Sequence, residues 1–433
     1  MHCVCTATLK DDVSSEQSIL IVGAGPAGCA AAYDLAEVGV RVLLLDRRSF
    51  PRHKACACGL TRKTLKALRY SVDPIVEQVC DEIVLEAAAG DSTKLRLRDR
   101  KPIAAMAVRE RFDAFCLEQT LAAGKNGGGV SFRRIDSIAA LRETGDGIEL
   151  DVVFSEGSEQ TRETLRATVL IGADGSNGQT RRLAAQLDAG RAEAVVTQPS
   201  EATWYERGFA LEATVPYTVL PVPLPEGDGP KDLLFDFSPL PGGYGWLFPK
   251  GDHINIGVGA FAPSDGVAAS KEVALKQVTR RLLADYTLRK LGVELEAVGG
   301  PVTGQYLGMG GHRYAPRGRV LLVGDAAGLV DPLTGEGIHS AIVSGQAAAA
   351  AVLSTRARDF ADVAESYAKR LAPLQETLAF SERAARSFYR EPERGFRVMR
   401  TQLVGWLALK TYTDGLPVRF LRPLVRFAAR RSK

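Results

Sequence analysis

The chain has 433 residues, of which 45% are hydrophobic and 24% are charged, a composition typical of a folded globular protein rather than a disordered one. Its length allows two or three domain-sized units. The formal net charge of +4 is too small to indicate nucleic-acid binding, and no run approaches the ~20 apolar residues of a membrane span.

The N-terminal segment, residues 1–16, is polar and carries several charges, which predicts a flexible tail. A secretory signal needs an apolar stretch that this tail lacks, so we expect a cytoplasmic protein. All seven cysteines lie between Cys3 and Cys116, and at this chain length we expect reduced thiols rather than a disulfide framework. The five histidines do not cluster with cysteine, so we expect no metal site.

The first chemical signal is a glycine-rich turn between two predicted strands. Residues 18–22 are expected to form a buried strand, and residues 40–45 a second strand that ends in Asp46. Between them a helix is predicted at about residues 26–38. The turn that opens this helix reads Gly23-Ala24-Gly25-Pro26-Ala27-Gly28.

Each glycine of the turn has a separate physical role in a dinucleotide site. Gly23 permits the tight bend, Gly25 lets the backbone approach a pyrophosphate, and Gly28 allows the helix to pack closely on the strand. The helix N-terminus attracts phosphate charge, and Asp46 can accept hydrogen bonds from an adenosine ribose. The segment predicts a dinucleotide site, without choosing between FAD and NAD(P).

Two further strands end in similar turns. Residues 169–171 lead into Gly172-Ala-Asp174-Gly175. Later, residues 319–323 lead into Gly324-Asp325 and then, through a second glycine-rich stretch, into an Ala-rich helix at about residues 338–353.

The order of these three turns resembles that of the p-hydroxybenzoate-hydroxylase-like flavoproteins, which bind FAD across such strands. The resemblance implies that Asp174 and Asp325 lie at the cofactor, with Asp325 holding its hydroxyl groups. Gly337 and Ile338 would present backbone N–H groups to the flavin ring. A helix N-terminus suits the negative charge of a reduced flavin, so FAD is the expected cofactor.

Three local motifs narrow the resemblance. Residues 54–60, Lys-Ala-Cys-Ala-Cys-Gly-Leu, are similar to the Cys-Gly-Gly-Gly-Leu segment of the geranylgeranyl reductase family. Residues 243–250 match its Tyr-x-Trp-x-Phe-Pro-Lys signature, residues 324–338 are close to its Gly-Asp segment, and Arg109 fits its Arg-x-x-Phe-Asp helix start. The resemblance covers most of residues 18–355.

Members of this family are FAD enzymes that hydrogenate isolated double bonds of prenyl chains. The resemblance therefore implies an FAD-dependent reductase of a polyprenyl, geranylgeranyl-type substrate, with NAD(P)H or another donor supplying electrons. It also implies that Arg109 and the loop residues Cys56, Ala57 and Gly59 lie at the cofactor. A flavin-dependent monooxygenase of a lipophilic substrate is the alternative. A flavin halogenase is disfavoured because no Gly-Glu pair follows Lys54, and a non-catalytic flavin sensor is the remaining class.

The chain departs from the family pattern at four positions. Ala57 and Cys58 replace two glycines, Asp331 stands where Asn is usual, and Gly178 occupies a serine position. The resulting pair Cys56 and Cys58 leaves three interpretations open. These are inert buried thiols, a redox pair that a Cys-x-Cys loop would strain, and a thiol that closes over the flavin.

The aromatic signature has its own physical interpretation. Tyr244, Trp246 and Phe248 alternate with other residues, so a strand would place all three rings on one face. That face is either ordinary core or the wall of a cavity for an apolar substrate, and the family resemblance favours the wall. Candidate catalytic proton sources are Cys56, Tyr244 and Glu336.

The predicted organisation is an α/β fold in which a Rossmann-like FAD-binding domain is discontinuous, formed by residues 17–73, 104–186 and 304–353. Strand-like runs in residues 194–300 predict an antiparallel β-sheet domain over the flavin that binds the substrate. Residues 356–433 are expected to be helical.

The C-terminal end of the chain is basic. Residues 394–433 contain ten Lys or Arg and one Asp, a local charge of +9. Amphipathic helices at residues 401–412 and 417–430 could lie on an anionic membrane surface, which would make the protein peripheral, or pack on the body of the protein with their arginines solvated.

Overall fold

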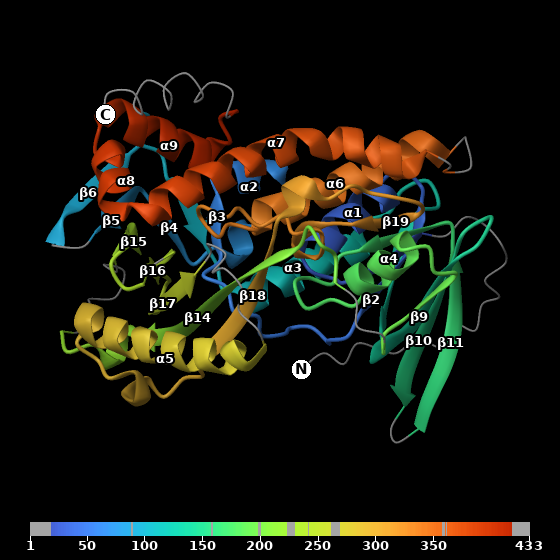
Figure 1. Cartoon of the computed structure of the whole chain (residues 1–433), viewed down its shortest axis with the longest axis horizontal. Helices are drawn as coiled ribbons and strands as arrows, with labels where there is room; N and C mark the ends of the chain where they lie inside the picture. The colour runs from blue at the N-terminus through green and yellow to red at the C-terminus, as the bar shows by residue number, and fades with distance from the viewer. Residues whose placement is uncertain are drawn as a thin grey trace.

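The structure is a computed structural model that describes residues 19–87, 90–156, 159–197, 201–222, 230–240, 242–260, 269–356, 360 and 362–417. The predicted tail, residues 1–16, and the basic residues 418–433 lie outside these ranges. Figure 1 shows an elongated molecule with a sheet at each end and a helical layer along its length.

A five-stranded parallel sheet forms the centre of the nucleotide-binding part, in the spatial order β19 (Val320–Leu322), β12 (Val169–Gly172), β1 (Ile19–Val22), β2 (Arg41–Asp46) and β8 (Gly129–Arg134). Every residue of β1 and β12 is buried, as expected for short apolar strands inside a parallel sheet. The strands come from the three segments predicted for the FAD-binding domain.

Helices cover this sheet. α1 (Pro26–Ala36), which is two residues shorter than predicted, packs on α3 (Arg109–Ala122) and α6 (Ile338–Thr355), and α7 (Val363–Arg390) packs on α6 (Figure 1). α6 is long and apolar enough to cross a membrane by length and composition alone, but 61% of it is buried inside the protein. Its apolar character is therefore that of a core helix.

A seven-stranded sheet forms the second large unit, in the order β18 (Thr303–Met309), β14 (Glu206–Pro216), β17 (His253–Ala260), β16 (Gly243–Pro249), β15 (Asp232–Asp236), β5 (Glu82–Glu86) and β6 (Ser92–Arg96). The predicted strands within residues 194–300 are confirmed. The sheet also takes β5, β6 and β18 from outside that range, and the β15–β5 pair is parallel, whereas an antiparallel sheet was expected. β5 and β15 are short strands far apart in sequence, and nothing in their sequences indicated that they pair.

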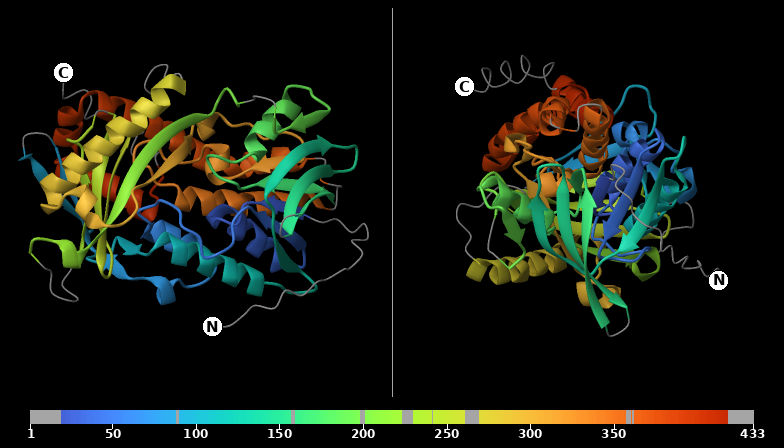
Figure 2. Two further views of the ribbon diagram at one scale, coloured as in Figure 1. Left: turned by 90° about the horizontal axis from the view of Figure 1, so that it is seen from below. Right: turned by 90° about the vertical axis from the view of Figure 1, so that its right-hand side faces the viewer.

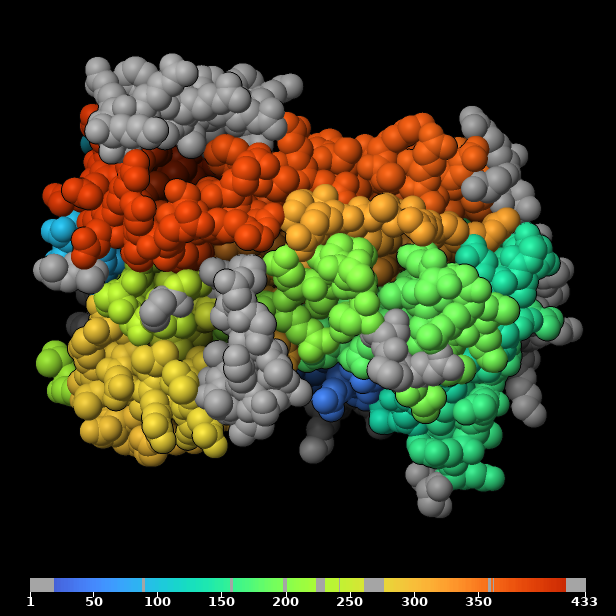
Figure 3. Space-filling view, viewed as in Figure 1, coloured from blue at the N-terminus to red at the C-terminus, as the bar shows by residue number. Residues whose placement is uncertain are grey.

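The two faces of this sheet have different contents. One face packs against α5 (Ala269–Leu291), where Leu211, Ile256 and Tyr286 belong to one apolar cluster. The other face carries aromatic side chains that pack with residues of α7, α8 (Pro392–Met399) and α9 (Gln402–Asp414). In the space-filling view, α5 and the C-terminal helices lie at the same end of the molecule (Figure 3).

Smaller elements complete the fold. A four-stranded sheet lies at the opposite end of the molecule (Figure 2), in the order β11 (Glu159–Ala167), β10 (Ile148–Glu156), β9 (Ser137–Glu143) and β13 (Glu193–Val195). A three-stranded sheet contains β3 (Gly59–Thr61), β7 (Ala104–Met106) and β4 (Gln78–Cys80). The remaining α-helices of the described residues are α2 (Arg62–Ala67) and α4 (Thr180–Asp188).

Of the two predicted amphipathic helices, α9 packs on the protein. Leu407 and Leu409 are buried, and the Arg98 guanidinium lies over the Trp406 ring at 5.1 Å. The predicted helix at residues 417–430 lies outside the described residues, apart from its first residue.

Candidate functional site

A cavity of about 700 Å³ lies between the parallel sheet and the seven-stranded sheet. Its size falls in the range of small-molecule and cofactor sites. Of the residues that the sequence predicted to bind cofactor or substrate, all except Gly28 line this cavity. The structure thus brings together groups that are up to about three hundred positions apart in the chain.

The glycine-rich turn forms one end of the cavity. Gly23 has a φ of +108°, and a Cβ atom there would lie 2.2 Å from the Ala173 carbonyl oxygen. A Cβ on Gly28 would lie 1.8 Å from the Gly23 carbonyl oxygen, because α1 packs directly on the turn. At Gly25 the nearest atom to such a Cβ is Nη2 of Arg52, at 3.7 Å. The space beside Gly25 is therefore open, as a backbone cradle for a pyrophosphate requires.

Asp46 stands at the end of β2 beside this cradle. Its Oδ2 accepts a hydrogen bond of 2.8 Å from the Ala24 N–H, and its Oδ1 accepts one of 2.8 Å from the Arg48 N–H. The two bonds fix the carboxylate against the turn and leave lone pairs on both oxygens. This position fits the predicted ribose contact of a dinucleotide.

The N-terminus of α6 forms a second anion-binding edge. Gly337 and Ile338 line the cavity, and a Cβ on Gly337 would lie 3.4 Å from Oδ1 of Asp325. The first N–H groups of a helix have no partners within it and carry partial positive charge. The cradle at Gly25, the carboxylates of Asp46 and Asp325, and this helix end together fit FAD.

Asp174 lines the cavity, but its carboxylate also has structural partners. It accepts hydrogen bonds from the backbone N–H groups of Gln179, at 2.6 Å, and Thr180, at 2.9 Å, and so caps α4. Burial raises its pKa, which these hydrogen bonds oppose. A Cβ on Gly178 would lie 2.1 Å from Oδ1 of Asp174, so the glycine packs directly against this carboxylate. Contact of Asp174 with the cofactor stays a prediction.

Cationic side chains line the wall between the two glycine-rich turns. The buried Arg109 donates from Nε to Oδ1 of Asp113 at 2.7 Å, and Nη2 of Arg52 lies 3.1 Å from Oδ2 of the same carboxylate. Lys54 is nearby, and burial and the Arg109 charge lower its pKa. Arg52, Lys54 and Arg109 thus place three cationic side chains at this wall, which suits a bound diphosphate.

The cysteine loop crosses the middle of the cavity. The Cys56 N–H donates to Oε1 of Glu212 at 2.7 Å, and the Cys58 N–H donates to Sγ of Cys56 at 3.3 Å. Lys250 donates from Nζ to the Ala57 carbonyl. Cys58 has a φ of +48°, a left-handed conformation that accounts for the family's glycine at this position. Both thiols are free in the structure.

The two thiols differ in proton affinity. A side-chain hydrogen bond from the Cys58 thiol and the charge of Arg109 lower the pKa of Cys56 well below its ordinary value, although burial opposes this. This bond between the two side chains, together with burial, raises the pKa of the Cys58 thiol. Cys56 is therefore the more acidic thiol of the pair.

An aromatic wall forms the other end of the cavity. Tyr244, Trp246 and Phe248 all line it from β16, which confirms the predicted alternation. Phe235 of β15 lies with its ring centroid 5.2 Å from those of both Tyr244 and Phe248. Tyr412 of α9 adds a fifth ring, 6.2 Å from Phe235. This wall can bind an apolar chain with few hydrogen-bonding demands.

Comparisons with known proteins identify the family. A family model described as an FAD binding domain matches residues 16–197. An uncharacterized protein of Methanosarcina barkeri is 31% identical over 347 residues, covering 78% of this chain and 74% of the relative. Digeranylgeranylglycerophospholipid reductase 1 of Methanopyrus kandleri is 28% identical, covering 82% and 84% of the two chains. The chain belongs to the geranylgeranyl reductase family of FAD-dependent oxidoreductases.

Solved structures agree on the fold of this family. A geranylgeranyl bacteriochlorophyll reductase-like protein of Thermoplasma acidophilum superimposes with a TM-score of 0.66 at 20% identity, covering 94% of this chain and 99% of its own. A flavin-dependent brominase superimposes with the same TM-score at 16% identity, covering 96% and 99% of the two chains. These likenesses show that the chain shares its fold with both proteins, whose names describe different reactions.

The lining residues of this family member that were not predicted from sequence include Glu212, Phe235 and Tyr412. A single charged residue inside the apolar run 209–215 was a signal for Glu212, because a charge in a buried strand needs a partner or a function. Phe235 and Tyr412 gave no such signal, since their positions depend on long-range strand pairing and on the packing of α9.

Trp246 is held in place by a glycine on the neighbouring strand. A Cβ on Gly257 would lie 2.1 Å from the Trp246 ring, because the indole crosses this position to donate from Nε1 to Oδ1 of Asn255 at 2.7 Å. The Trp of the signature in residues 243–250 therefore requires a glycine at position 257 of β17.

We expect Gly257→Ala to lower the free energy of unfolding by about 1–3 kcal/mol, because the new methyl group displaces the indole and breaks its hydrogen bond. Gly129→Ala in β8 is the matched control, since a Cβ there would have nothing within 4 Å. Urea denaturation of both variants measures the difference. Equal stability of the two would contradict the packing described here.

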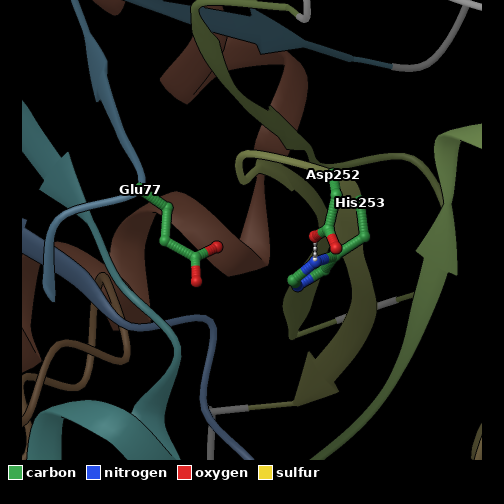
Figure 4. Close-up of side chains that lie close together, drawn as sticks. All are labelled: Glu77, Asp252 and His253. Atoms are coloured by element: carbon green, nitrogen blue, oxygen red, sulfur yellow. Dashed lines mark hydrogen bonds and ion pairs between the residues drawn. The ribbon is translucent and has the colours of Figure 1, made fainter. Parts of the chain in front are cut away.

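A further group of potential metal ligands lies on the surface. Single ligand atoms of Glu77, Asp252 and His253 lie within 4.8 Å of one another (Figure 4). Glu77 is already paired with Arg111 at 2.8 Å, and the Asp252 side chain is 91% exposed. Because one acid is already paired with a cation and another lies in solvent, we assign no metal to this group.

Proposed function

We propose that this chain uses FAD to saturate carbon–carbon double bonds of a polyprenyl substrate, with NAD(P)H or another donor supplying the electrons. One observation carries the proposal: the glycine cradle and the aromatic wall line the same cavity. The names of relatives support it, since they include digeranylgeranylglycerophospholipid reductases and a geranylgeranyl diphosphate reductase of Rhodobacter capsulatus.

The residues around the cavity have distinct tasks in this reaction. When bound, FAD supplies a hydride to one alkene carbon. The backbone at Gly25 and the carboxylates of Asp46 and Asp325 would hold the cofactor, and the N-terminus of α6 would stabilise negative charge on the reduced ring. The aromatic rings bind the prenyl chain and exclude water, so that charge developing on the alkene meets oriented groups rather than solvent.

A lipophilic substrate resides in membranes, which affects where in the cell the enzyme must act. We propose a cytoplasmic enzyme that meets its substrate at an anionic membrane surface through the basic C-terminal region, residues 394–433. Within the described residues, Arg397 is exposed on α8. Vesicles containing anionic lipid should sediment the protein at low salt and release it at high salt.

The activity is tested with purified holoenzyme, reduced anaerobically and mixed with prenyl lipids, prenyl quinones and prenyl diphosphates in turn. We expect mass spectrometry to detect products heavier by two hydrogen atoms for each saturated bond. Free reduced FAD without protein is the control. Unchanged prenyl saturation with every substrate would reject the proposal, and an oxygen-dependent gain of one oxygen atom would establish the monooxygenase alternative.

A further inference from the structure

Saturation of an isolated alkene needs a proton as well as a hydride, and the three candidates from sequence are poor proton donors. Lys63 lies 2.9 Å from Glu336, and although burial would raise the pKa of Glu336, this ion pair holds it below its ordinary value. The pKa of Cys56 is lowered by the Cys58 thiol and by Arg109, which favours the form that has already lost its proton. The Tyr244 hydroxyl already donates to the Thr334 carbonyl, and burial raises its pKa further.

Glu212 is a fourth acid, and it faces the aromatic wall. It lies in β14, is 7% exposed and lines the cavity. In the register of the sheet Glu212 pairs with Gly257, and Gly257 pairs with Trp246. Directly paired residues of antiparallel strands point to the same face. Because Gly257 has no side chain, no other side chain stands between Glu212 and the indole in this row.

The hydrogen bonds of Glu212 define where its proton resides. Oε1 accepts the Cys56 N–H at 2.7 Å. When the side chain is neutral, this oxygen is the carbonyl-type acceptor and Oε2 carries the proton. The Asn255 side chain also bonds to Glu212, and Trp246 fixes that amide by donating to its Oδ1. The substrate wall and the acid are therefore oriented by one network.

The charge environment of Glu212 favours the neutral acid at neutral pH. Burial and the electrostatic effect of Cys56 raise the pKa of Glu212 to about 8, and Lys250 opposes this shift. Once ionised, the carboxylate keeps the Cys56 N–H and gains from Lys250. Both protonation states are thus accommodated, as a group that cycles between them requires.

We propose that Glu212 is a catalytic residue that protonates the second alkene carbon. The inference rests on the proposed reductase function, in which the reduced cofactor supplies the hydride. The π bond breaks, one new C–H bond takes the hydride with its electron pair, and the other takes the proton from Oε2. Glu212 is left as a carboxylate and regains a proton from solvent before the next turnover.

The first test measures the acid itself, without turnover. Infrared spectra of oxidised holoenzyme at about pH 6 and about pH 10, on either side of the expected pKa, should contain a protonated-carboxyl band that disappears at the higher pH. The band should be missing from Glu212→Gln. If the variant retains the whole band, Glu212 is not the neutral acid and the proposal is overturned.

The second test distinguishes a loss of proton donation from a loss of folding. Glu212→Gln keeps an acceptor for the Cys56 N–H, so we expect normal FAD content and normal flavin reduction by dithionite. Alkene reduction should be slower by about 10²- to 10⁴-fold. The wild-type rate should fall as the pH rises through about 8, and this fall should be absent from the variant. Glu206→Gln, on the same strand and paired with Arg313 outside the cavity, should behave as wild type.

The outcomes distinguish the two proposals. A wild-type rate of alkene reduction in Glu212→Gln would overturn the role of Glu212 and leave the reductase function standing. Failure of wild-type holoenzyme to reduce any prenyl chain would overturn both, whatever the infrared result.

Discussion

Alanine at position 28 is expected to leave the protein without FAD and less stable by about 3 kcal/mol or more. The new Cβ would lie 1.8 Å from the Gly23 carbonyl oxygen and 3.3 Å from the Ala173 side chain. The first neighbour is backbone and cannot rotate away, so α1 must move off β1. That movement opens the turn and displaces the helix N-terminus from the cavity.

Gly25→Ala is the matched control for this prediction, and it should separate cofactor binding from folding. Gly25 has a φ of −80°, which alanine adopts freely, and its Cβ would have no neighbour closer than 3.7 Å. We expect the free energy of unfolding to change by less than about 0.5 kcal/mol. The methyl group would occupy the cradle and weaken FAD binding by about 10- to 100-fold.

Flavin fluorescence titration and urea denaturation of both variants measure these effects. If Gly25→Ala binds FAD as tightly as the wild type does, the pyrophosphate does not lie at Gly25. If Gly28→Ala retains wild-type stability, the close packing of α1 on the turn is wrong.

The second large effect concerns stability and pH. The pKa of Glu212 is about 8 in the folded protein against an ordinary value of 4.5. A raised pKa in the folded state means that folding binds a proton between these two values. The neutral Glu212 side chain therefore stabilises the folded protein relative to the ionised side chain. This stabilisation is fully present below about pH 4.5 and is lost as the pH rises through about 8.

Glu212→Gln does not titrate, so its stability relative to wild type should increase with pH across this window. We expect a gain of about 3–5 kcal/mol between about pH 5 and about pH 9. Urea denaturation of both proteins at several pH values measures the gain, and Glu206→Gln serves as the control. A difference that does not vary with pH would show that Glu212 titrates normally.

The cradle could be predicted from sequence because its determinants are local. Gly23, Gly25 and Gly28 act within one strand–turn–helix unit, and Asp46 ends the next strand. The ring alternation in β16 is local as well, and it placed three of the five aromatic residues. The contacts that each ring makes across the cavity depend on residues distant in sequence, and so do the partners of the acidic side chains.

The remaining features arise from contacts between distant segments. β5 joins β15 in parallel across about 150 positions of the chain, and α9 brings Tyr412 to the wall. Glu212 of β14 contacts the cysteine loop by accepting a hydrogen bond from the Cys56 N–H, although the two residues are far apart in sequence. The motifs therefore predicted where the cofactor lies, while the acid that faces the aromatic wall emerged only from the fold.

FAD and an apolar chain are expected to occupy one cavity, where a hydride passes from the reduced flavin to the chain. Anaerobic single-turnover mixing of fully reduced holoenzyme with a prenyl substrate tests it most directly. We predict that the absorbance of oxidised flavin returns at the same rate as the saturated product forms. One double bond should be saturated for each FAD that is reoxidised. Flavin that stays reduced while the substrate stays unsaturated would contradict it.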